Sequence, residues 1–406
     1  MTPALAPIQP KAKQALNKDF PQFPFWPHFS EDEIAAAAEV LRSGRVNYWT
    51  GEHGRRFEQE FAAKCGCKHA VAVANGTVAL ELALRSLGIG AGDDVIVPSR
   101  TFVASASCVA MCGARPVFAD VDRDSQNITA ATIEAVLSPA TRAIIAVHLA
   151  GWPCEMNSIL KLAHRENLLV IEDCAQAQGA TYCGKPVGSF GDTAAFSFCQ
   201  DKIMTTGGEG GTLVTNNSAV FERAWAFKDH GKNYALARTT NNNGSIRRLH
   251  HSVGTNWRMT EVQAAIGRRQ LLKVPDWRRQ RRRNAEILYT PLSRLPALRI
   301  PVPPDHIEHA FYRFCAFVRP EMLKSDWNRD RILQTISSQG VPCSSGGSGE
   351  LYLEQAFASS RLPEGLPIAS EIAGTSLAFL VHPTLGKHDM ETMSEIATNV
   401  LQAASL

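Results

Sequence analysis

Short apolar runs alternate with longer amphipathic stretches from about residue 70 to residue 215. Each run is rich in β-branched residues and is followed by a turn with Gly, Asn or Asp, which is typical of a strand that precedes a helix. Strands that are apolar on both faces and alternate with helices indicate a mostly parallel sheet covered by helices. We therefore predict an α/β fold, with strands at residues 70–74, 94–98, 116–120, 143–149, 168–172, 194–198 and 212–215.

The helical pattern begins before these strands and continues after them. Ser30 is followed three residues later by Glu33 and then by an Ala-rich run, which predicts a helix that lasts until Gly44. Residues 259–272 and 275–288 also have helical patterns, and a high density of proline from about residue 290 indicates a domain boundary. We expect an N-terminal arm at residues 1–29, a large α/β domain at 30–285 and a smaller C-terminal domain at 286–406.

Composition and charge exclude several classes of protein. The chain has 406 residues, and its 42 Lys and Arg against 39 Asp and Glu give a net charge of +3. This balance is typical of a globular protein and provides no general field for nucleic acid. No apolar stretch approaches the roughly 20 residues of a membrane span. The N-terminus lacks the apolar core of a secretory signal and the ten cysteines lack the spacing of metal ligands, so we expect a reduced, cytoplasmic protein.

Polar residues follow three expected strands at their carboxyl ends, where open parallel sheets bind ligands. Gly76 and Thr77 open a helix and offer backbone N–H groups to an anion, although a helix cap alone also explains them. Asp173 can hold a proton on a heterocyclic nitrogen, with a helix cap as the alternative. Lys202 lies between a buried strand and a glycine-rich turn, where partial desolvation is expected to lower the pKa of its amine. A solvated surface lysine is the alternative.

An anion cradle, an acid for a ring nitrogen and an amine together form the set of groups that pyridoxal 5′-phosphate (PLP) requires. With the motifs around them, the sequence resembles the DegT/DnrJ/EryC1/StrS sugar aminotransferases over about residues 50–271. The motifs are ANGTVALELAL, VPSRTFVASA, FADVD, HLAGWP, IEDCAQAQGA, GSFGDTAAFSF, the lysine with GGEGG, and GTNWRMTEVQAAIG. The resemblance implies the fold type I of PLP-dependent transferases, in which a mostly parallel sheet is flanked by helices and a smaller C-terminal α+β domain follows.

The resemblance also implies roles for four residues around the ring of the cofactor. Lys202 would be the Schiff-base lysine and the proton shuttle. Asp173 would pair with the pyridinium nitrogen, and Gln176 would lie against the ring hydroxyl. Phe102 matches the aromatic residue that stacks on the ring, where flat contact leaves its edges free.

Four further residues match the phosphate site of the family. Gly76 and Thr77 would hold the cofactor phosphate together with Ser197. Asn256 matches a residue that reaches the phosphate in the neighbouring subunit. A site shared in this way implies a homodimer.

Members of this family move an amino group from an amino acid, for which L-glutamate is expected, to a keto group at C3 or C4 of a nucleotide-linked sugar. The products enter surface polysaccharides or glycosylated natural products. Here residues 341–357 (VPCSSGGSGELYLEQAF) lack the His of the family's sugar site, so the sugar stays open. Residues 233–251 form a long loop that is expected to cover the sugar or the nucleotide. The alternatives are a PLP-dependent sugar dehydratase, in which a histidine typically replaces the lysine, and a non-catalytic PLP-fold sensor.

Two features outside these motifs have plain structural explanations. The run WRRQRRR at residues 277–283 distributes its arginines around a helix, which favours a solvated or interface helix over a nucleic-acid stripe. One or two of these arginines could instead meet the acidic substrate. His148 and His309 lie where a substrate could contact them, but we interpret each as a structural histidine.

Overall fold

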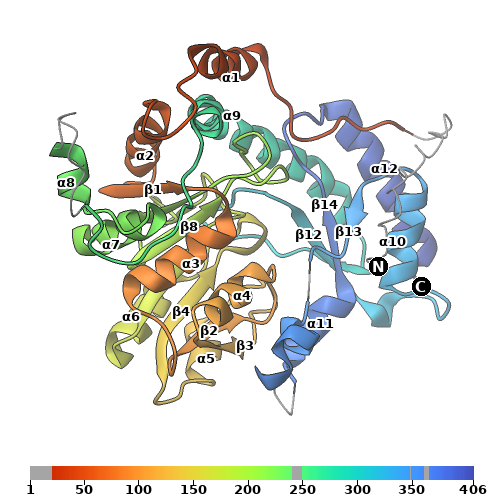
Figure 1. Ribbon diagram of the computed structural model, residues 1–406. Coiled ribbons are helices and arrows are strands. Elements are labelled where there is room, and N and C mark those ends of the chain that lie inside the picture. Colours follow the sequence, from red (N-terminus) through yellow and green to blue (C-terminus); the bar gives the residue numbers. More distant parts are fainter. Residues whose placement is uncertain (1–20, 240–248, 348, 361–364) are drawn as a thin grey trace, which may run out of the picture.

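The computed structural model describes residues 21–239, 249–347, 349–360 and 365–406, and its centre is a seven-stranded sheet (Figure 1). Strand β9 is antiparallel to both of its neighbours, and all other neighbouring strands are parallel. This confirms the predicted α/β fold, and each observed strand starts within two residues of its predicted start. In spatial order the strands are β1 (His69–Val73), β9 (Gly211–Thr215), β8 (Thr193–Ser197), β5 (Leu169–Asp173), β4 (Thr141–Val147), β2 (Asp94–Pro98) and β3 (Arg115–Ala119).

Helices bury both faces of this sheet, which explains why its strands are apolar throughout. Helix α3 packs on β8 and β9 and against its neighbours α4 and α7, while α2 packs on β1. Val71, Ile96 and Ile144 are completely buried between these layers. The helices of this part are α2 (His53–Lys64), α3 (Gly76–Leu87), α4 (Ala104–Met111), α5 (Ala130–Glu134), α6 (Met156–Glu166), α7 (Ser218–Lys228) and α8 (Tyr234–Thr239).

Helix α1 (Glu31–Ser43) begins and ends where the sequence predicts. The backbone N–H of Ser30 donates to Glu33 Oε2 at 2.6 Å, which is one half of a capping box. Gly44 adopts a left-handed conformation, with φ of 68°, and ends the helix because glycine has no Cβ to clash there. The predicted helix is therefore confirmed at both ends.

The C-terminal part has its own small sheet and its own apolar core, which includes Leu288, Phe314 and Leu377. The sheet order is β10 (Leu298–Arg299), β12 (Phe314–Val318), β14 (Ser376–Phe379) and β13 (Cys343–Ser344), and its helices are α10 (Arg329–Ser338), α11 (Pro367–Thr375) and α12 (Lys387–Ala404). A three-stranded sheet of β11 (Ile307–Glu308), β6 (Thr181–Tyr182) and β7 (Lys185–Pro186) joins the two parts. Short 3-10 helices occupy Leu149–Gly151, Pro320–Met322, Leu351–Leu353 and Gln355–Ser360.

One long helix, α9 (Glu261–Leu292), connects the two parts. The prediction of two separate helices is wrong, because α9 continues through Pro275. It packs against α1 and α2 in the large part and against α12 in the small part. Packing along both halves outweighs the single backbone hydrogen bond that a proline removes. The boundary expected after residue 285 falls inside this helix and stays a prediction.

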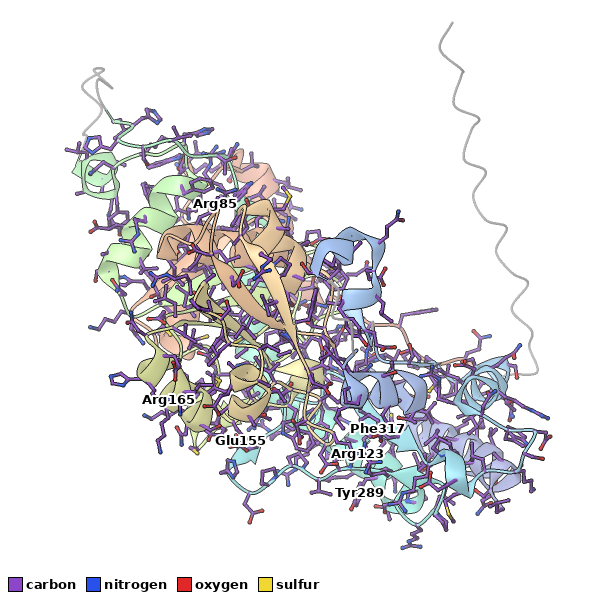
Figure 2. All side chains as sticks on the ribbon, turned by 90° about the horizontal axis from the view of Figure 1, so that it is seen from below. Arg85, Arg123, Glu155, Arg165, Tyr289 and Phe317 are labelled. Carbon is purple, nitrogen blue, oxygen red and sulfur yellow. The ribbon has the colours of Figure 1, made fainter. Side chains whose placement is uncertain are left out.

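Ion pairs link the two parts along the underside of the molecule. Arg123, labelled in Figure 2, pairs with Glu371 of α11 at 2.7 Å. Arg299 of β10 pairs with Asp124 in the same region. Among the residues that the structure describes, no helix is both long enough and apolar enough to cross a bilayer.

Candidate functional site

The carboxyl ends of β5 and β8 lie side by side, because the two strands are parallel neighbours. Asp173 is the last residue of β5, and Ser197 is the last residue of β8. The loop after β8 carries Lys202, whose charge acts on the Asp173 carboxyl. The structure therefore brings together the acid, the amine and the serine that the sequence singled out.

Asp173 is a buried carboxyl with few hydrogen-bond donors around it. The Ser105 hydroxyl donates to Oδ2 at 2.8 Å, and the backbone N–H of Ala175 donates to Oδ1 at 3.1 Å. Burial raises the pKa of Asp173, although these two hydrogen bonds and the charge of Lys202 oppose the rise. A buried carboxylate is stabilised when a cation lies beside it. The site therefore fits a group with a protonated ring nitrogen.

Lys202 lies largely buried beside Asp201 and Tyr312. Its Nζ is 3.3 Å from Asp201 Oδ2 and 5.1 Å from the centre of the Tyr312 ring. Burial lowers the pKa of this amine, but Tyr312 and Asp201 raise it more, so it lies above its ordinary value. The expectation of a lowered pKa is therefore wrong for the chain as it stands. The causes are Tyr312 and the Asp201 carboxylate, which together outweigh the lost hydration of the amine.

A glycine-lined cradle forms where α3 begins. A Cβ added at Gly76 would lie 2.5 Å from Ser197 Cβ, so a larger residue does not fit there. The Asn75 side chain accepts from Val78 N–H at 3.0 Å and caps the helix. The first N–H groups of a helix have no partner within it and attract anions. Gly76, with Thr77 next to it and Ser197 opposite, can hold a phosphate group.

Three other predicted residues surround this region. Gln176 Oε1 accepts from the backbone N–H of Ala150 at 2.7 Å, which fixes its side chain against the turn after β4. Phe102 precedes α4 and is 64% exposed, and Asn256 is also exposed. Their contacts with a cofactor or a second subunit stay predictions. Of the loop at residues 233–251, α8 occupies the first part and residues 240–248 lie outside the described chain.

Several residues that contact the predicted ones were not identified from the sequence. Ser105 binds Asp173 and also lies 3.0 Å from the Thr101 hydroxyl. The hydroxyl of Tyr312 donates to Asp201. Trp26 Nε1 donates to the backbone carbonyl of Lys202 at 2.7 Å, so this part of the expected arm packs on the site. Ser105 belongs to the VPSRTFVASA motif, and this position was a signal that could have identified it.

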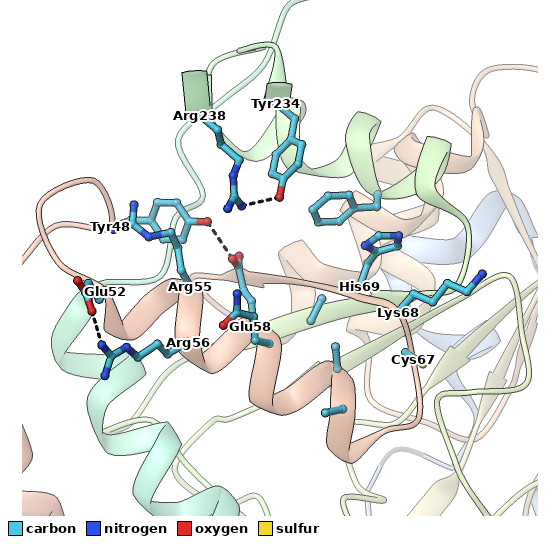
Figure 3. A pocket seen from close by; sticks show the side chains of 15 residues that line it. Tyr48, Glu52, Arg55, Arg56, Glu58, Cys67, Lys68, His69, Tyr234 and Arg238 are labelled. Atoms are coloured by element: carbon cyan, nitrogen blue, oxygen red, sulfur yellow. Dashed lines mark hydrogen bonds and ion pairs between the residues drawn. The ribbon is translucent and has the colours of Figure 1, made fainter. Parts of the chain in front are cut away.

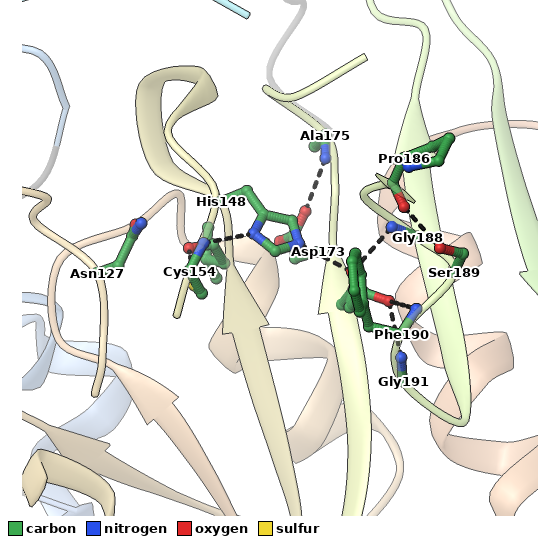
Figure 4. A network of polar contacts seen from close by, with 12 residues as sticks. Asn127, His148, Cys154, Asp173, Ala175, Pro186, Gly188, Ser189, Phe190 and Gly191 are labelled. Carbon is green, nitrogen blue, oxygen red and sulfur yellow. Dashed lines mark hydrogen bonds and ion pairs between the residues drawn. The ribbon is translucent and has the colours of Figure 1, made fainter. Parts of the chain in front are cut away.

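Glu172, next to Asp173, is hydrogen-bonded to His148 and to the turn at residues 188–191. Figure 4 shows His148 and the residues of this turn beside Asp173. His148 Nδ1 accepts from Cys154 N–H at 2.9 Å, so its Nε2 carries the proton and donates to Glu172 at 3.1 Å. In the described part of the chain, one group could hold a metal ion: His148, Glu172 and Cys174, whose possible ligand atoms lie within 4.8 Å of one another. Their ring and carboxylate atoms already have partners, and burial raises the pKa of Cys174 well above the ordinary value. This network is structural, as predicted for His148.

The arginine run at residues 277–283 lies on α9 and does not form a stripe. Arg278 pairs with Glu308 at 2.6 Å and Arg282 with Glu286 at 3.0 Å, both near the surface. Arg281 points the other way and is buried. This arrangement supports the interpretation as a solvated helix over a nucleic-acid stripe, and the alternative of an interface helix stays a prediction.

Comparisons with known proteins decide the family. The DegT/DnrJ/EryC1/StrS aminotransferase family matches residues 27–398. The chain belongs to this family. It is therefore an aminotransferase, and the family resemblance is confirmed over nearly the whole chain.

Individual members of the family are similar over most of their length. The GDP-perosamine synthase of Caulobacter vibrioides is 42% identical over 76% of this chain and 82% of its own. The dTDP-3-amino-3,4,6-trideoxy-alpha-D-glucose transaminase of Streptomyces venezuelae is 36% identical over 86% and 87%. The solved structure of an aminotransferase from Psychrobacter cryohalolentis is 48% identical, covers 94% of this chain and all of its own, and has a TM-score of 0.92. The expected fold type I is thereby confirmed.

Proposed function

We propose that this aminotransferase uses PLP to transfer an amino group from L-glutamate to a keto group of a nucleotide-linked sugar. The observation that carries the proposal is the meeting of Lys202 and Asp173 at neighbouring strand ends, beside the cradle of Gly76 and Ser197. When bound, PLP supplies an electron sink that stabilises negative charge on a substrate carbon.

Lys202 and Asp173 would perform the chemical roles. The Lys202 amine would attach the cofactor and move a proton at the α-carbon of the donor. Asp173 would keep a proton on the ring nitrogen, and the resulting positive charge would compensate the burial of its carboxylate. The Ser105 hydroxyl would orient this carboxylate from the other side.

The remaining predicted residues would position the cofactor. Gly76, Thr77 and Ser197 would hold the phosphate, and Gln176 would bind the ring hydroxyl. Phe102, whose ring is exposed in the single chain, would stack on the ring. The exposed Asn256 would reach the phosphate in the second subunit of a homodimer.

The substrate and the compartment are supported by different observations. The two curated relatives are named for GDP- and dTDP-linked amino sugars, which supports a nucleotide-linked acceptor. All ten cysteines are free in the structure, which supports a reducing compartment such as the cytoplasm. A sugar dehydratase is less well supported because Lys202 is present where that activity typically has a histidine.

The test is a pair of half-reactions on the purified protein. Incubation with PLP should give a visible absorption band that Lys202→Arg lacks. L-Glutamate should bleach the band, and one member of a panel of nucleotide keto-sugars should restore it. A band that no amino acid bleaches would favour the non-catalytic sensor. Loss of water from a sugar without consumption of glutamate would favour the dehydratase.

A further inference from the structure

A cavity of about 400 Å³ lies next to the loop that carries Lys202. Its walls come from the N-terminal segment at residues 21–26, from the second half of α9 and from residues 340–342 of the small part. Asp201 lines it, and Asp201 Oδ2 is 3.3 Å from Lys202 Nζ. The amine at the centre of the proposed chemistry therefore contacts a residue that lines this cavity.

Arg281 in the wall of this cavity is a buried cation without an acidic partner. It is 1% exposed, and its Nε and Nη2 have no hydrogen-bond partner in the described structure. Its Nη1 reaches only the carbonyls of Phe311 and Tyr312, each at 3.4 Å, and its guanidinium lies 5.3 Å from the centre of the Trp26 ring. Burying an unpaired charge is costly, so this arrangement indicates a missing anion.

A second guanidinium, that of Arg313, adds to the positive charge of the cavity. Arg313 also lines the cavity, and within the described residues no ion pair involves it. Burial and the charges of Arg281 and Arg313 lower the pKa of His382, on the same wall, to about 3. Asp201 is the one acid among the lining residues, and Lys202 and the Tyr312 hydroxyl already engage it. The cavity therefore has an excess of positive charge.

A larger cavity of about 570 Å³ near the β1 edge of the sheet also has more basic than acidic residues, but among its described lining residues no basic side chain is buried (Figure 3). Its buried Glu58 accepts from Lys228 at 2.5 Å and from the Tyr48 hydroxyl at 2.8 Å. Arg56 pairs with Glu52, and Arg238 donates to the Tyr234 hydroxyl. Its basic side chains are exposed or half-buried, so water can solvate them and no ligand is needed to balance their charge.

We propose that the cavity beside Asp201 binds a carboxylate of the amino-acid donor, with Arg281 and Arg313 as the residues that select it. The inference rests on the proposed function, since it assigns the donor to the same site. Guanidinium groups match the planar geometry of a carboxylate and bind it through paired N–H donors. The position next to Lys202 lets one end of the donor bind here while its amino group lies near the reacting centre.

Single-turnover kinetics of Arg313→Gln and Arg281→Lys test the assignment. Each variant should raise the Kd of L-glutamate in the donor half-reaction by about 10- to 100-fold. This is the range expected for loss of a charge-assisted hydrogen bond. The rate of the acceptor half-reaction with a nucleotide keto-sugar should stay unchanged. Arg283→Gln, an exposed position on the same helix, is the control and should leave both half-reactions unchanged.

Two results would overturn the assignment. The first is an unchanged Kd for L-glutamate in Arg313→Gln. The second is a loss of rate confined to the acceptor half-reaction, which would mean that the cavity binds an anionic group of the nucleotide sugar instead of the donor. Calorimetry with glutarate on the cofactor-free protein gives a readout independent of turnover. Wild type should bind glutarate, and Arg313→Gln should bind it at least about 10-fold more weakly. If no amino acid bleaches the wild-type cofactor while this Arg313-dependent binding remains, the proposed function fails and the anion site stands.

Discussion

Glu172 and Asp173 are consecutive buried acids on β5 with opposite surroundings. Glu172 accepts four hydrogen bonds, from His148 at 3.1 Å and from the backbone N–H groups of Gly188, Phe190 and Gly191, each at 2.8 Å. Asp173 accepts two, from Ser105 and Ala175. Side chains alternate across a strand, so one acid faces the turn at 188–191 and the other faces the loop of Lys202.

The number of hydrogen bonds distinguishes the two acids: Glu172 stabilises the fold, whereas Asp173 is available to bind a ligand. A carboxylate whose lone pairs are filled by the chain gains nothing from a further partner. A buried carboxylate with fewer donors is unstable as an anion until a cation arrives. Two adjacent positions of one strand thus contribute separately to stability and to function, and each can be changed while the other is kept.

Lys202→Arg should have the largest effect, and this effect should be on turnover and not on stability. We expect turnover to drop by about 10⁴-fold, because the variant loses both the nucleophile and the proton carrier. The arginine can keep an ion pair with Asp201, so the melting temperature should change little. Steady-state amine transfer and calorimetry measure the two quantities. Substantial remaining turnover would remove Lys202 from the chemistry.

Asp173→Asn tests the neighbouring acid without changing its shape. Turnover should fall by about 10³-fold, because an amide does not stabilise a positive ring nitrogen. The cofactor-free protein should become more stable by about 1 kcal/mol, since an active-site charge that is unfavourable for folding has been removed. Urea unfolding of the cofactor-free protein measures this gain. A loss of stability instead would mean that Asp173 is structural like Glu172.

The stability gain of Asp173→Asn should depend on pH. Burial raises the pKa of the folded Asp173 carboxyl above its ordinary value of 3.8, so the folded state holds this proton more tightly than the unfolded state. The ionised form therefore destabilises the fold increasingly as the pH rises from that value through the raised pKa. The free-energy difference between variant and wild type should be largest at neutral pH and should disappear only well below pH 3.8, where the carboxyl is protonated in both the folded and the unfolded state. A difference that is constant with pH would contradict this cause.

Glu172→Gln makes the same acid-to-amide change as Asp173→Asn, but at the acid that stabilises the fold. The amide replaces one carboxylate oxygen with an N–H₂ group that faces two donors, so we expect a loss of about 3 kcal/mol in the free energy of unfolding. The turnover of the remaining folded protein should stay close to wild type. Urea unfolding and turnover per folded molecule measure these effects. A large drop in turnover with unchanged stability would reverse the roles of the two acids.

The sequence indicated which residues lie at the strand ends, but not the electrostatic surroundings of these residues. Position after a strand is a local pattern, so Asp173, Lys202 and Gly76 could be identified from their neighbours. The raised pKa of Lys202 depends partly on Tyr312, which is distant in sequence. Arg281 belongs to an arginine run whose sequence predicts a solvated helix. Only the packing of α9 against Trp26 shows that the Arg281 side chain is buried. Long-range packing determines the burial and the pKa of such side chains, and the periodicity of the sequence does not predict this packing.

Ser105→Ala should have the smallest effect and sharpens the comparison most directly. It removes one of the two donors to Asp173, which leaves this carboxylate still less satisfied than Glu172. Loss of one hydrogen bond to a buried acid is worth about 1 kcal/mol, so cofactor affinity should weaken by about 5-fold. The pKa of Asp173 should rise further, and the pH dependence of the stability of the cofactor-free protein should extend to higher pH. Thr101→Val, which removes a hydroxyl that contacts Ser105 but not Asp173, is the control, and an equal effect from it would show that the loss does not come from the hydrogen bond between Ser105 and Asp173 itself.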